Sequence, residues 1–273
     1  MPAADPSAIR ILAEVVANCC EGGAHHRLTL RVPGWPGFAP GQFVMLSPGP
    51  VGAVPRSDPL LPRPMAVFRE HADERGPCLE VLYKRSGRGT HLLAAAVAGE
   101  SIALVGPLGS GFRAPSAPGA ALLVAGGTGI ASVFELARTL ADERAVSVLL
   151  GARRAEDLMG EADFAELHVN LEIATEDGSR GTRGLVTDLL EKRLAAEPGA
   201  TVYACGPTPM MQRCVEIAAA HGAACSVSLE NNMACGFGVC LGCAAPRTSG
   251  GFALVCCDGP VFDGRDIVWS QLP

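Results

Sequence analysis

Five cysteines lie close together near the C-terminus of this 273-residue chain. The first three, Cys235, Cys240 and Cys243, have the spacing C-x4-C-x2-C, and Cys256 and Cys257 follow. Plant-type [2Fe–2S] clusters are held by four cysteines with the spacing C-x4-C-x2-C…C. Zinc sites more often have two short C-x2–4-C pairs, whereas this stretch has one. The spacing therefore favours an iron–sulfur cluster, with zinc or no metal as the alternative.

Glycines at positions 236, 238 and 242 separate these cysteines. A loop that wraps a cluster needs residues without a Cβ where a side chain would crowd the sulfides or where φ must be positive. Its backbone N–H groups can also donate to the cysteine sulfurs. On spacing alone the fourth ligand is either Cys256 or Cys257. We expect "FALVCCD" to be a strand, in which the two side chains point in opposite directions and only one faces the cluster.

Two glycine-containing turns, "VAGGTGIA" and "YACGPTPMM", each follow a buried strand-like run and open a helical stretch. Glycines there let phosphates approach the backbone, and a helix N-terminus favours negative charge. Because the carboxyl ends of parallel strands meet at one edge of a sheet, the two turns predict a nucleotide crevice between them. We expect Cys205 at the rim of this crevice, and the alternative is that its side chain only packs in the core. For "VAGGTGIA" the alternative is an ordinary tight turn without a nucleotide. The candidate residues are Gly126, Gly127, Thr128, Gly129, Cys205, Gly206 and Pro207.

A third candidate site lies in the first part of the chain. "LPRPMAV" has Arg63 at the start of a strand, and "LYKRSGRGTHLL" has Gly89 and Thr90 at the entry to a short helix. An arginine beside a glycine-containing helix N-terminus predicts a pyrophosphate clamp. The alternative is a surface arginine beside an ordinary turn.

The elements that must position these residues follow two different rhythms. Residues 1–115 contain six short strand-like runs separated by Gly/Pro turns, which predicts a small antiparallel β-barrel with one short helix. A Pro/Ala-rich linker follows, and strands then alternate with helices, as in a parallel α/β sheet. We therefore expect three units, 1–115, 116–224 and 225–273, the last of which carries the cysteine cluster.

Composition excludes some classes of partner. The net charge is −6 and only 5% of the residues are aromatic, so the chain lacks the basic and stacking surface of a nucleic-acid binder. The N-terminal stretch has no basic region followed by an apolar core, and we expect a cytoplasmic protein without a membrane segment. In the cytosol, eleven cysteines do not indicate a disulfide framework.

The motifs together resemble a known family. Arg63-Pro64, Gly89-Thr90, "GPLGSGF", "GGTGIA", "CGPTPMM" and C-x4-C-x2-C…"VCCDGPVF" are similar to the electron-transfer subunit of NAD-linked bacterial dihydroorotate dehydrogenase, within the ferredoxin–NADP reductase superfamily. The resemblance covers essentially the whole chain in the same order. Its most specific part is the cysteine motif with "DGPVF", because the barrel and "CGP" motifs occur throughout the superfamily.

The resemblance implies a multi-domain fold of a FAD-binding β-barrel, a NAD-binding parallel α/β domain and a small [2Fe–2S] domain. In the family one residue separates the fourth cysteine from Asp-Gly-Pro. The implied metal ligands are therefore Cys235, Cys240, Cys243 and Cys256, with Cys257 as a bystander.

The resemblance also implies the flavin-binding residues, with one departure. The family's R-P-x-S motif ends here in Ala66, which offers only its backbone N–H where a serine hydroxyl is expected near flavin N5. This bears on flavin tuning more than on flavin binding. The implied residues are Arg63, Pro64, Met65 and Ala66, then Leu82, Tyr83 and Lys84, and finally Gly89 and Thr90.

The implied function is that of an oxidoreductase subunit in pyrimidine biosynthesis. An FMN-containing catalytic subunit would oxidise dihydroorotate, and its electrons would reach NAD⁺ through the cluster and FAD of this chain, in a heterotetramer of two copies of each subunit. The alternatives are a related FAD/[2Fe–2S] subunit serving ferredoxin or a hydrogenase, a self-contained reductase, and a zinc-binding module. Glu176 and Asp177 would disfavour the 2′-phosphate of NADP, whereas Arg153 and Arg154 would favour it. These residues therefore do not decide whether the chain prefers NAD or NADP.

Overall fold

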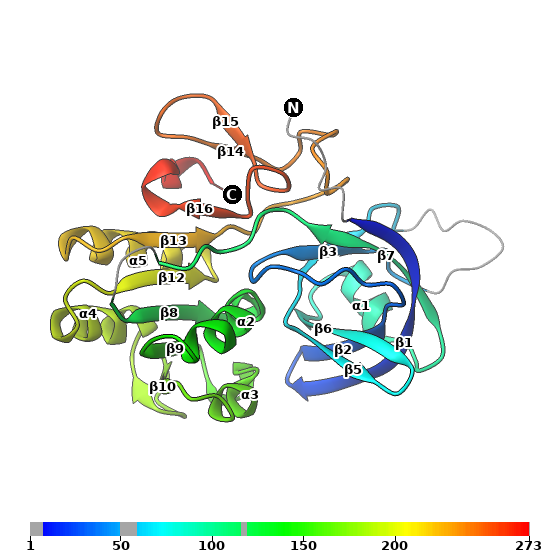
Figure 1. Ribbon diagram of the computed structural model, residues 1–273, viewed down its shortest axis with the longest axis horizontal. Coiled ribbons are helices and arrows are strands. Elements are labelled where there is room, and N and C mark those ends of the chain that lie inside the picture. The colour runs from blue at the N-terminus through cyan, green and yellow to red at the C-terminus, as the bar shows by residue number, and fades with distance from the viewer. Residues whose placement is uncertain (1–7, 50–58, 116–118, 273) are drawn as a thin grey trace.

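A computed structural model describes residues 8–49, 59–115 and 119–272 of the chain. Figure 1 shows a β-barrel on one side, an α/β unit on the other, and a C-terminal region that lies across both. Residues 116–118 of the predicted linker lie outside the described residues. Among the described residues, no helix has the length and apolar character needed to cross a membrane.

The barrel is a single antiparallel sheet of seven strands in the order β4-β3-β7-β1-β2-β6-β5. Six strands were expected. The difference arises because the run "RPMAVFRE" is divided at Val67 and Phe68 into β4, which pairs with β3, and β5, which pairs with β6. The strands are Ile9–Gly22 (β1), His25–Arg31 (β2), Phe43–Leu46 (β3), Arg63–Ala66 (β4), Arg69–Asp73 (β5), Gly76–Lys84 (β6) and Ser101–Leu108 (β7), and the short helix is Arg88–Ala94 (α1).

The central sheet has the order β11-β10-β9-β8-β12-β13-β16 and is parallel except for β16. Its strands are Ala121–Gly126 (β8), Val146–Ala152 (β9), Asn170–Thr175 (β10), Thr182–Arg183 (β11), Thr201–Cys205 (β12), Cys225–Ser228 (β13) and Val261–Asp263 (β16). The helices are Ile130–Ala141 (α2), Glu161–Ala165 (α3), Val186–Ala196 (α4) and Thr208–Ala220 (α5), with 3-10 turns at Gly127–Gly129, Ala155–Asp157, Gly264–Asp266 and Trp269–Gln271.

Helices cover both faces of this sheet, which explains why its strands are continuous apolar runs. Along β8, Leu123 and Ala125 belong to the core that contains α2, whereas Leu122 and Val124 belong to the core that contains α4 and α5. Side chains alternate between the two faces of a strand, so a strand buried on both faces must be apolar at every position. The predicted parallel α/β architecture is confirmed.

The C-terminal region is not separate from the central sheet. Cys225, expected to open the cysteine unit, is the first residue of β13, which pairs with β12, and β16 then pairs with β13 from the other side. Between β13 and β16 lie the cysteine loop and the hairpin of Ala244–Pro246 (β14) and Phe252–Leu254 (β15). The cysteine loop is therefore held at both ends by strands of the nucleotide-binding unit.

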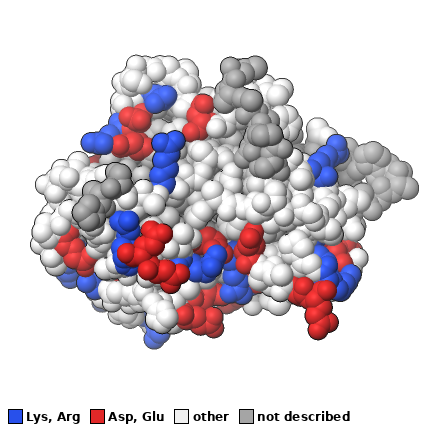
Figure 2. Space-filling view, viewed as in Figure 1, with Lys and Arg blue, Asp and Glu red and all other residues white. Residues whose placement is uncertain are grey.

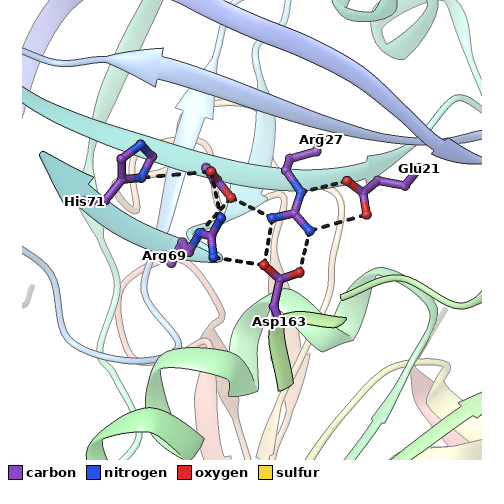
Figure 3. Close-up of polar contacts among 6 residues, drawn as sticks. Glu21, Arg27, Arg69, His71 and Asp163 are labelled. Carbon is purple, nitrogen blue, oxygen red and sulfur yellow. Dashed lines mark hydrogen bonds and ion pairs between the residues drawn. The ribbon is translucent and has the colours of Figure 1, made fainter. Parts of the chain in front are cut away.

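An ion-pair cluster joins the barrel to helix α3 of the central unit (Figure 3). Asp163 on α3 accepts from Arg27 Nη2 at 2.6 Å and from Arg69 Nη1 at 2.9 Å, and Glu80 of β6 pairs with both arginines. Figure 2 shows oppositely charged side chains intermingled over the lower half of this face, where the two units meet. Below the charges, the rings of Phe68 and Phe134 lie 4.4 Å apart. The contact therefore fixes the orientation of the barrel relative to the central sheet.

Candidate iron–sulfur and nucleotide sites

The cysteine loop brings two of the proposed ligands into contact. The Sγ atoms of Cys243 and Cys256 lie 3.2 Å apart, and both residues are buried. Cys240 is exposed and Cys235 is partly buried, with hydrogen bonding between their side chains. The thiols therefore form an inner pair, Cys243 and Cys256, and an outer pair, Cys235 and Cys240.

Backbone conformation in the loop matches what the sequence predicted for two of the three glycines. Gly236 and Gly238 have φ of 85° and 81°, values that favour glycine because it lacks a Cβ. N–H groups point at the sulfurs: that of Gly238 donates to Cys256 Sγ at 3.2 Å, and that of Gly242 to Cys240 Sγ at 3.5 Å. Such N–H···S contacts stabilise the thiolate form that binds metal.

The two thiol pairs differ in their electrostatic surroundings. Burial raises the pKa of Cys235, but backbone hydrogen bonds from Cys240 and Phe237 outweigh it and bring this pKa down to about 7. Burial and the neighbouring thiol of Cys243 raise the pKa of Cys256. Of these two thiols, Cys235 is therefore the more readily ionised in the absence of metal.

Cys256 and Cys257 do not alternate across a strand, so that prediction is wrong. Strand β15 ends at Leu254, and the next four residues form a turn in which Cys257 N–H and Asp258 N–H both donate to the Leu254 carbonyl. Cys257 Sγ lies 3.6 Å from Cys256 Sγ. Cys257 is thus beside the proposed ligands and does not face away from them.

Four thiols around two irons fit this arrangement. A two-iron cluster with four cysteines places two thiolates on each iron, so it requires pairs of sulfurs. The inner and outer pairs meet this requirement, and the N–H···S contacts supply the hydrogen bonds that such clusters receive.

A cavity of about 480 Å³ lies between the barrel and the C-terminal ends of the central strands. From the predicted flavin set it is lined by Pro64, Met65, Ala66, Leu82, Tyr83, Lys84 and Thr90. Burial raises the pKa of Tyr83 to about 12, and its hydroxyl group donates to Asn18 Oδ1 at 3.0 Å. The ring of Tyr83 is therefore a fixed, neutral wall of this cavity.

Two of the predicted flavin residues lie behind the cavity wall. A Cβ added at Gly89 would lie 2.7 Å from Arg63 Nε, so the predicted arginine and helix N-terminus are indeed packed together. Arg63 Nη1 donates to the Leu61 carbonyl at 2.8 Å. The Thr90 hydroxyl accepts from the backbone N–H groups of Ser86 and Gly87, so it also caps its own helix.

A second cavity, of about 540 Å³, lies at the edge of the sheet where the two predicted turns meet. Of the predicted nucleotide residues, Gly126, Gly127, Thr128, Gly206 and Pro207 line it. Cys205 was expected at the rim, but its side chain is fully buried and burial raises its pKa to about 12. The rim position is therefore wrong for Cys205, and its side chain serves in packing below the cavity.

Gly129 supports the cavity without lining it, which yields a prediction. A Cβ at this position would overlap the Cys205 carbonyl and lie 2.7 Å from Gly206 N. We expect Gly129→Ala to force the two turns apart and to raise the KM for NADH by about tenfold or more, as a shift of ~1.4 kcal/mol would. NADH titration with ferricyanide as acceptor measures this. Val97→Ala, at a 61% exposed side chain on the barrel, is the control and should leave KM unchanged.

The two cavities share three lining residues, Lys84, Thr128 and Glu230. Lys84 ends β6 of the barrel, whereas Glu230 follows β13 of the central sheet and lies near Thr128, with 3.5 Å between Oε1 and Oγ1. Surrounding protein raises the pKa of the Glu230 carboxyl although its side chain still opens onto the cavities. The junction of the cavities is therefore where ligands in the two cavities would meet.

The cysteine loop adjoins the first cavity directly. Asn232 and Met233 line that cavity, and Cys235 follows Met233 by two residues, a span of at most about 7 Å along the chain. A Cβ at Gly236 would lie 2.6 Å from Met45 Cγ, so the loop rests on the barrel. The three candidate sites therefore form one continuous row: cysteine loop, first cavity, second cavity.

Of the four charged residues that bear on the choice between NAD and NADP, two line the second cavity and two do not. Arg153 and Glu176 line the second cavity, at the ends of the neighbouring strands β9 and β10. Arg154 pairs with Glu156 at 2.9 Å, and Asp177 accepts from Ser179. Arg154 and Asp177 do not line the cavity, which leaves Arg153 and Glu176 as the two candidates facing a nucleotide there.

Comparison with known proteins identifies the family. The oxidoreductase NAD-binding domain matches residues 123–216, and the iron–sulfur cluster binding domain of dihydroorotate dehydrogenase B matches residues 230–268. The chain is 38% identical to the "Dihydroorotate dehydrogenase B (NAD(+)), electron transfer subunit" of Geobacillus sp. (strain WCH70), over 84% of this chain and 87% of that protein. The chain belongs to this family of electron-transfer subunits. The counterpart in Listeria monocytogenes serovar 1/2a is 37% identical over 85% of this chain and 88% of its own.

Solved structures show the same fold. The structure of the NADH-dependent reduced ferredoxin–NADP oxidoreductase matches with a TM-score of 0.81 and 28% identity, over 96% of this chain and 91% of that one. The ferredoxin reductase of carbazole 1,9a-dioxygenase matches with a TM-score of 0.66 and 23% identity, over 79% of this chain and 67% of that one, and this likeness concerns the fold alone. The predicted family and architecture are both confirmed.

Sequence reasoning missed the segment 228–233, all six residues of which line the first cavity. A signal was present. Ser228 ends a parallel strand, and the residues that follow such a strand lie at the ligand-binding edge of the sheet. The sequence did not show that "CSVS" is a strand of this sheet. The cysteine cluster led us to place the boundary between the second and third units before residue 225, which assigned this strand to the cysteine unit.

Proposed function

We propose that this chain is the electron-transfer subunit of a dihydroorotate dehydrogenase that reduces NAD⁺, with FAD in the first cavity, NAD in the second and a [2Fe–2S] cluster in the cysteine loop. The observation that carries the proposal is the continuous row of these sites. The cysteine loop adjoins the first cavity through Met233, and the first cavity shares Lys84, Thr128 and Glu230 with the second. Family membership supports the same reading.

We assign the metal ligands as Cys235, Cys240, Cys243 and Cys256. The cluster exchanges single electrons and nicotinamide exchanges hydride, so the flavin, which does both, belongs between them. The flavin residues are those of the predicted set, with Arg63 and Gly89 supporting the cavity wall from behind. Gly126 and Gly206 bring backbone close to the second cavity, where phosphates bind well at a helix N-terminus.

The residues of this chain orient the reacting partners. The Lys84 side chain, from the barrel, and the Glu230 carboxyl, from the central sheet, flank the junction of the cavities. The neighbouring Tyr83 ring is buried and fixed by Asn18. Ala66 lines the first cavity, so its backbone is available there while a serine hydroxyl is not.

The partner that supplies electrons docks over the outer thiol pair. Cys240 is exposed, and apolar side chains surround it in the sequence: Phe237, Val239 and Leu241 are 48%, 70% and 60% exposed. Large exposed apolar side chains gathered in one loop mark a protein interaction site. We assign this loop to an FMN-containing catalytic subunit that oxidises dihydroorotate, in a cytoplasmic heterotetramer with two copies of each chain.

Docking at the loop yields a prediction. Val239→Glu places a charge at the centre of the apolar patch and should weaken binding of the catalytic subunit by about tenfold or more, because a desolvated unpaired charge is costly. Val97→Glu, at a 61% exposed valine on the barrel, is the matched control. Both proteins should reduce ferricyanide with NADH at the wild-type rate. Equal binding of the two variants, measured by calorimetry, would place the interface elsewhere.

The test of the whole proposal is co-expression with a candidate catalytic subunit, followed by an assay of dihydroorotate-dependent NAD⁺ reduction. We expect a stable complex with about one FAD and two irons per chain and with that activity. A second candidate function, a subunit that serves ferredoxin, is favoured by the structural match of 0.81 to the ferredoxin–NADP oxidoreductase. Electron transfer between NADH and ferredoxin, with no dihydroorotate-dependent activity in the co-expressed protein, would select this alternative, and purified protein without FAD would contradict both.

A further inference from the structure

Cys257 lies within the group of thiols that forms the proposed cluster site. Its Sγ is 3.6 Å from Cys256 Sγ, which is itself 3.2 Å from Cys243 Sγ. A Cβ added at Gly238 would lie 2.8 Å from Cys257 Sγ, so this sulfur rests against the loop between Cys235 and Cys240. The site therefore contains five thiols, one more than a [2Fe–2S] cluster uses.

The turn after β15 explains why two consecutive side chains face the same loop. The Leu254 carbonyl accepts from Cys257 N–H at 2.9 Å and from Asp258 N–H at 2.8 Å, and Leu254 N–H donates to Asp258 Oδ2 at 2.6 Å. These bonds close the chain tightly around residues 255–257. Gly238 lies against both sulfurs. Its N–H donates to Cys256 Sγ, and Cys257 Sγ occupies the space that a Cβ at this position would need.

We propose that Cys257 is an alternative fourth ligand of the cluster, able to replace Cys256. The proposal rests on the proposed function in requiring the cluster. In the exchange, the bond from iron to Cys256 sulfur is replaced by a bond from iron to Cys257 sulfur. The Cys257 thiol gives its proton to solvent, the Cys256 thiolate takes one up, and no electron is transferred. The cluster keeps four thiolates throughout.

The structure also explains which ligand is preferred. Cys256 is 2% exposed, accepts the Gly238 N–H and touches Cys243, whereas Cys257 is only partly buried. Cys256 therefore holds the cluster in the native protein, and Cys257 becomes the ligand when Cys256 is released or replaced. The fifth thiol would therefore help the protein to retain its cluster, because the outer ligand pair, Cys235 and Cys240, is open to solvent.

Three variants test the proposal: Cys256→Ala, Cys257→Ala and the double variant, each reconstituted with iron and sulfide. We expect Cys257→Ala to show about two irons per chain and the wild-type EPR spectrum. Cys256→Ala should also bind about two irons but with shifted g values, because the ligand geometry changes. The double variant should retain less than about a tenth of the iron, since three cysteines remain.

FAD content and circular dichroism report folding in every variant. If Cys256→Ala binds as little iron as the double variant while its FAD content is unchanged, Cys257 is not a ligand and the proposal is wrong. Should the alanine protein fail to fold, Cys256→Val and Cys256→Val/Cys257→Ala, which fill position 256 without a metal-binding atom, give the same comparison: equal iron in the two rejects the proposal, and loss only in the second supports it. Wild-type protein that binds no iron would instead reject the proposed function itself.

Discussion

A Cys243→Ala protein should purify with FAD but with less than about a hundredth of the wild-type rate of dihydroorotate-dependent NAD⁺ reduction. Cys243 is 2% exposed and belongs to the inner thiol pair, and the fifth thiol, Cys257, has its sulfur contact with Cys256, so we do not expect it to take the place of Cys243. NADH-dependent reduction of ferricyanide should remain within about twofold of wild type, because the two cavities do not include Cys243. The two assays, with iron quantitation, separate the cluster from the nucleotide sites.

Cys214→Ala is the control for this prediction. Cys214 is also fully buried, but it lies on α5 and belongs to the core of the central unit. It should retain full iron and both activities, at some cost in stability from the small cavity. Equal loss of dihydroorotate-dependent activity in the two variants would show that Cys243 acts through packing.

Asp163→Ala should lower the free energy of unfolding by about 2 kcal/mol, because it removes one of the two carboxylates that the largely buried Arg27 and Arg69 guanidinium groups share, while Glu80 still pairs with both. The Arg27 and Arg69 side chains are 15% and 30% exposed, and Asp163 is 12% exposed. The remaining pairs with Glu80 and the partial exposure of Arg69 keep the expected value below the range for buried pairs that lose a partner. Urea unfolding monitored by circular dichroism and by flavin fluorescence measures the change.

Asp163 also carries the contact between the barrel and α3, so activity should change along with stability. Lys84 comes from the barrel and Thr128 from the central unit, and hydride transfer requires the two sides of this junction to stay in register. We expect the rate of NADH-dependent flavin reduction to fall about tenfold. Glu156→Ala, which removes an ion pair whose side chains are 60% and 57% exposed, should change the unfolding free energy by less than about 1 kcal/mol. A similar small effect for Asp163→Ala would show that the aromatic contact alone holds the units together.

Local sequence was informative wherever a short stretch determines its own structure. The spacing of Cys235, Cys240 and Cys243 and the glycines between them predict a cluster-binding loop, since ligand reach and positive φ depend on neighbouring residues. The apolar runs of β8 and β12 predicted a sheet buried on both faces, because such strands need no polar face. Family and architecture followed from the order of these motifs.

Positions that depend on distant parts of the chain were predicted less well. Cys205 looked like a rim residue because it precedes a glycine turn, yet Ser132 and Ser228 from other elements enclose it. Glu230 went unnoticed because its place at the junction depends on β13 pairing with β12 across the intervening helix. The ion pairs of Asp163 join residues more than 90 positions apart, and no local pattern signals them.

The sequence by itself determined the family, the class of fold and the cofactors, and it predicted the residues that hold them, because each resides in residue type and short-range spacing. Tertiary structure alone decided how the three sites adjoin and which sulfurs meet. A strand would have turned Cys257 away from Cys256, whereas the turn closed on the Leu254 carbonyl leaves the two sulfurs 3.6 Å apart. The number of thiols at the site depends on that backbone hydrogen bonding, which side-chain spacing does not specify.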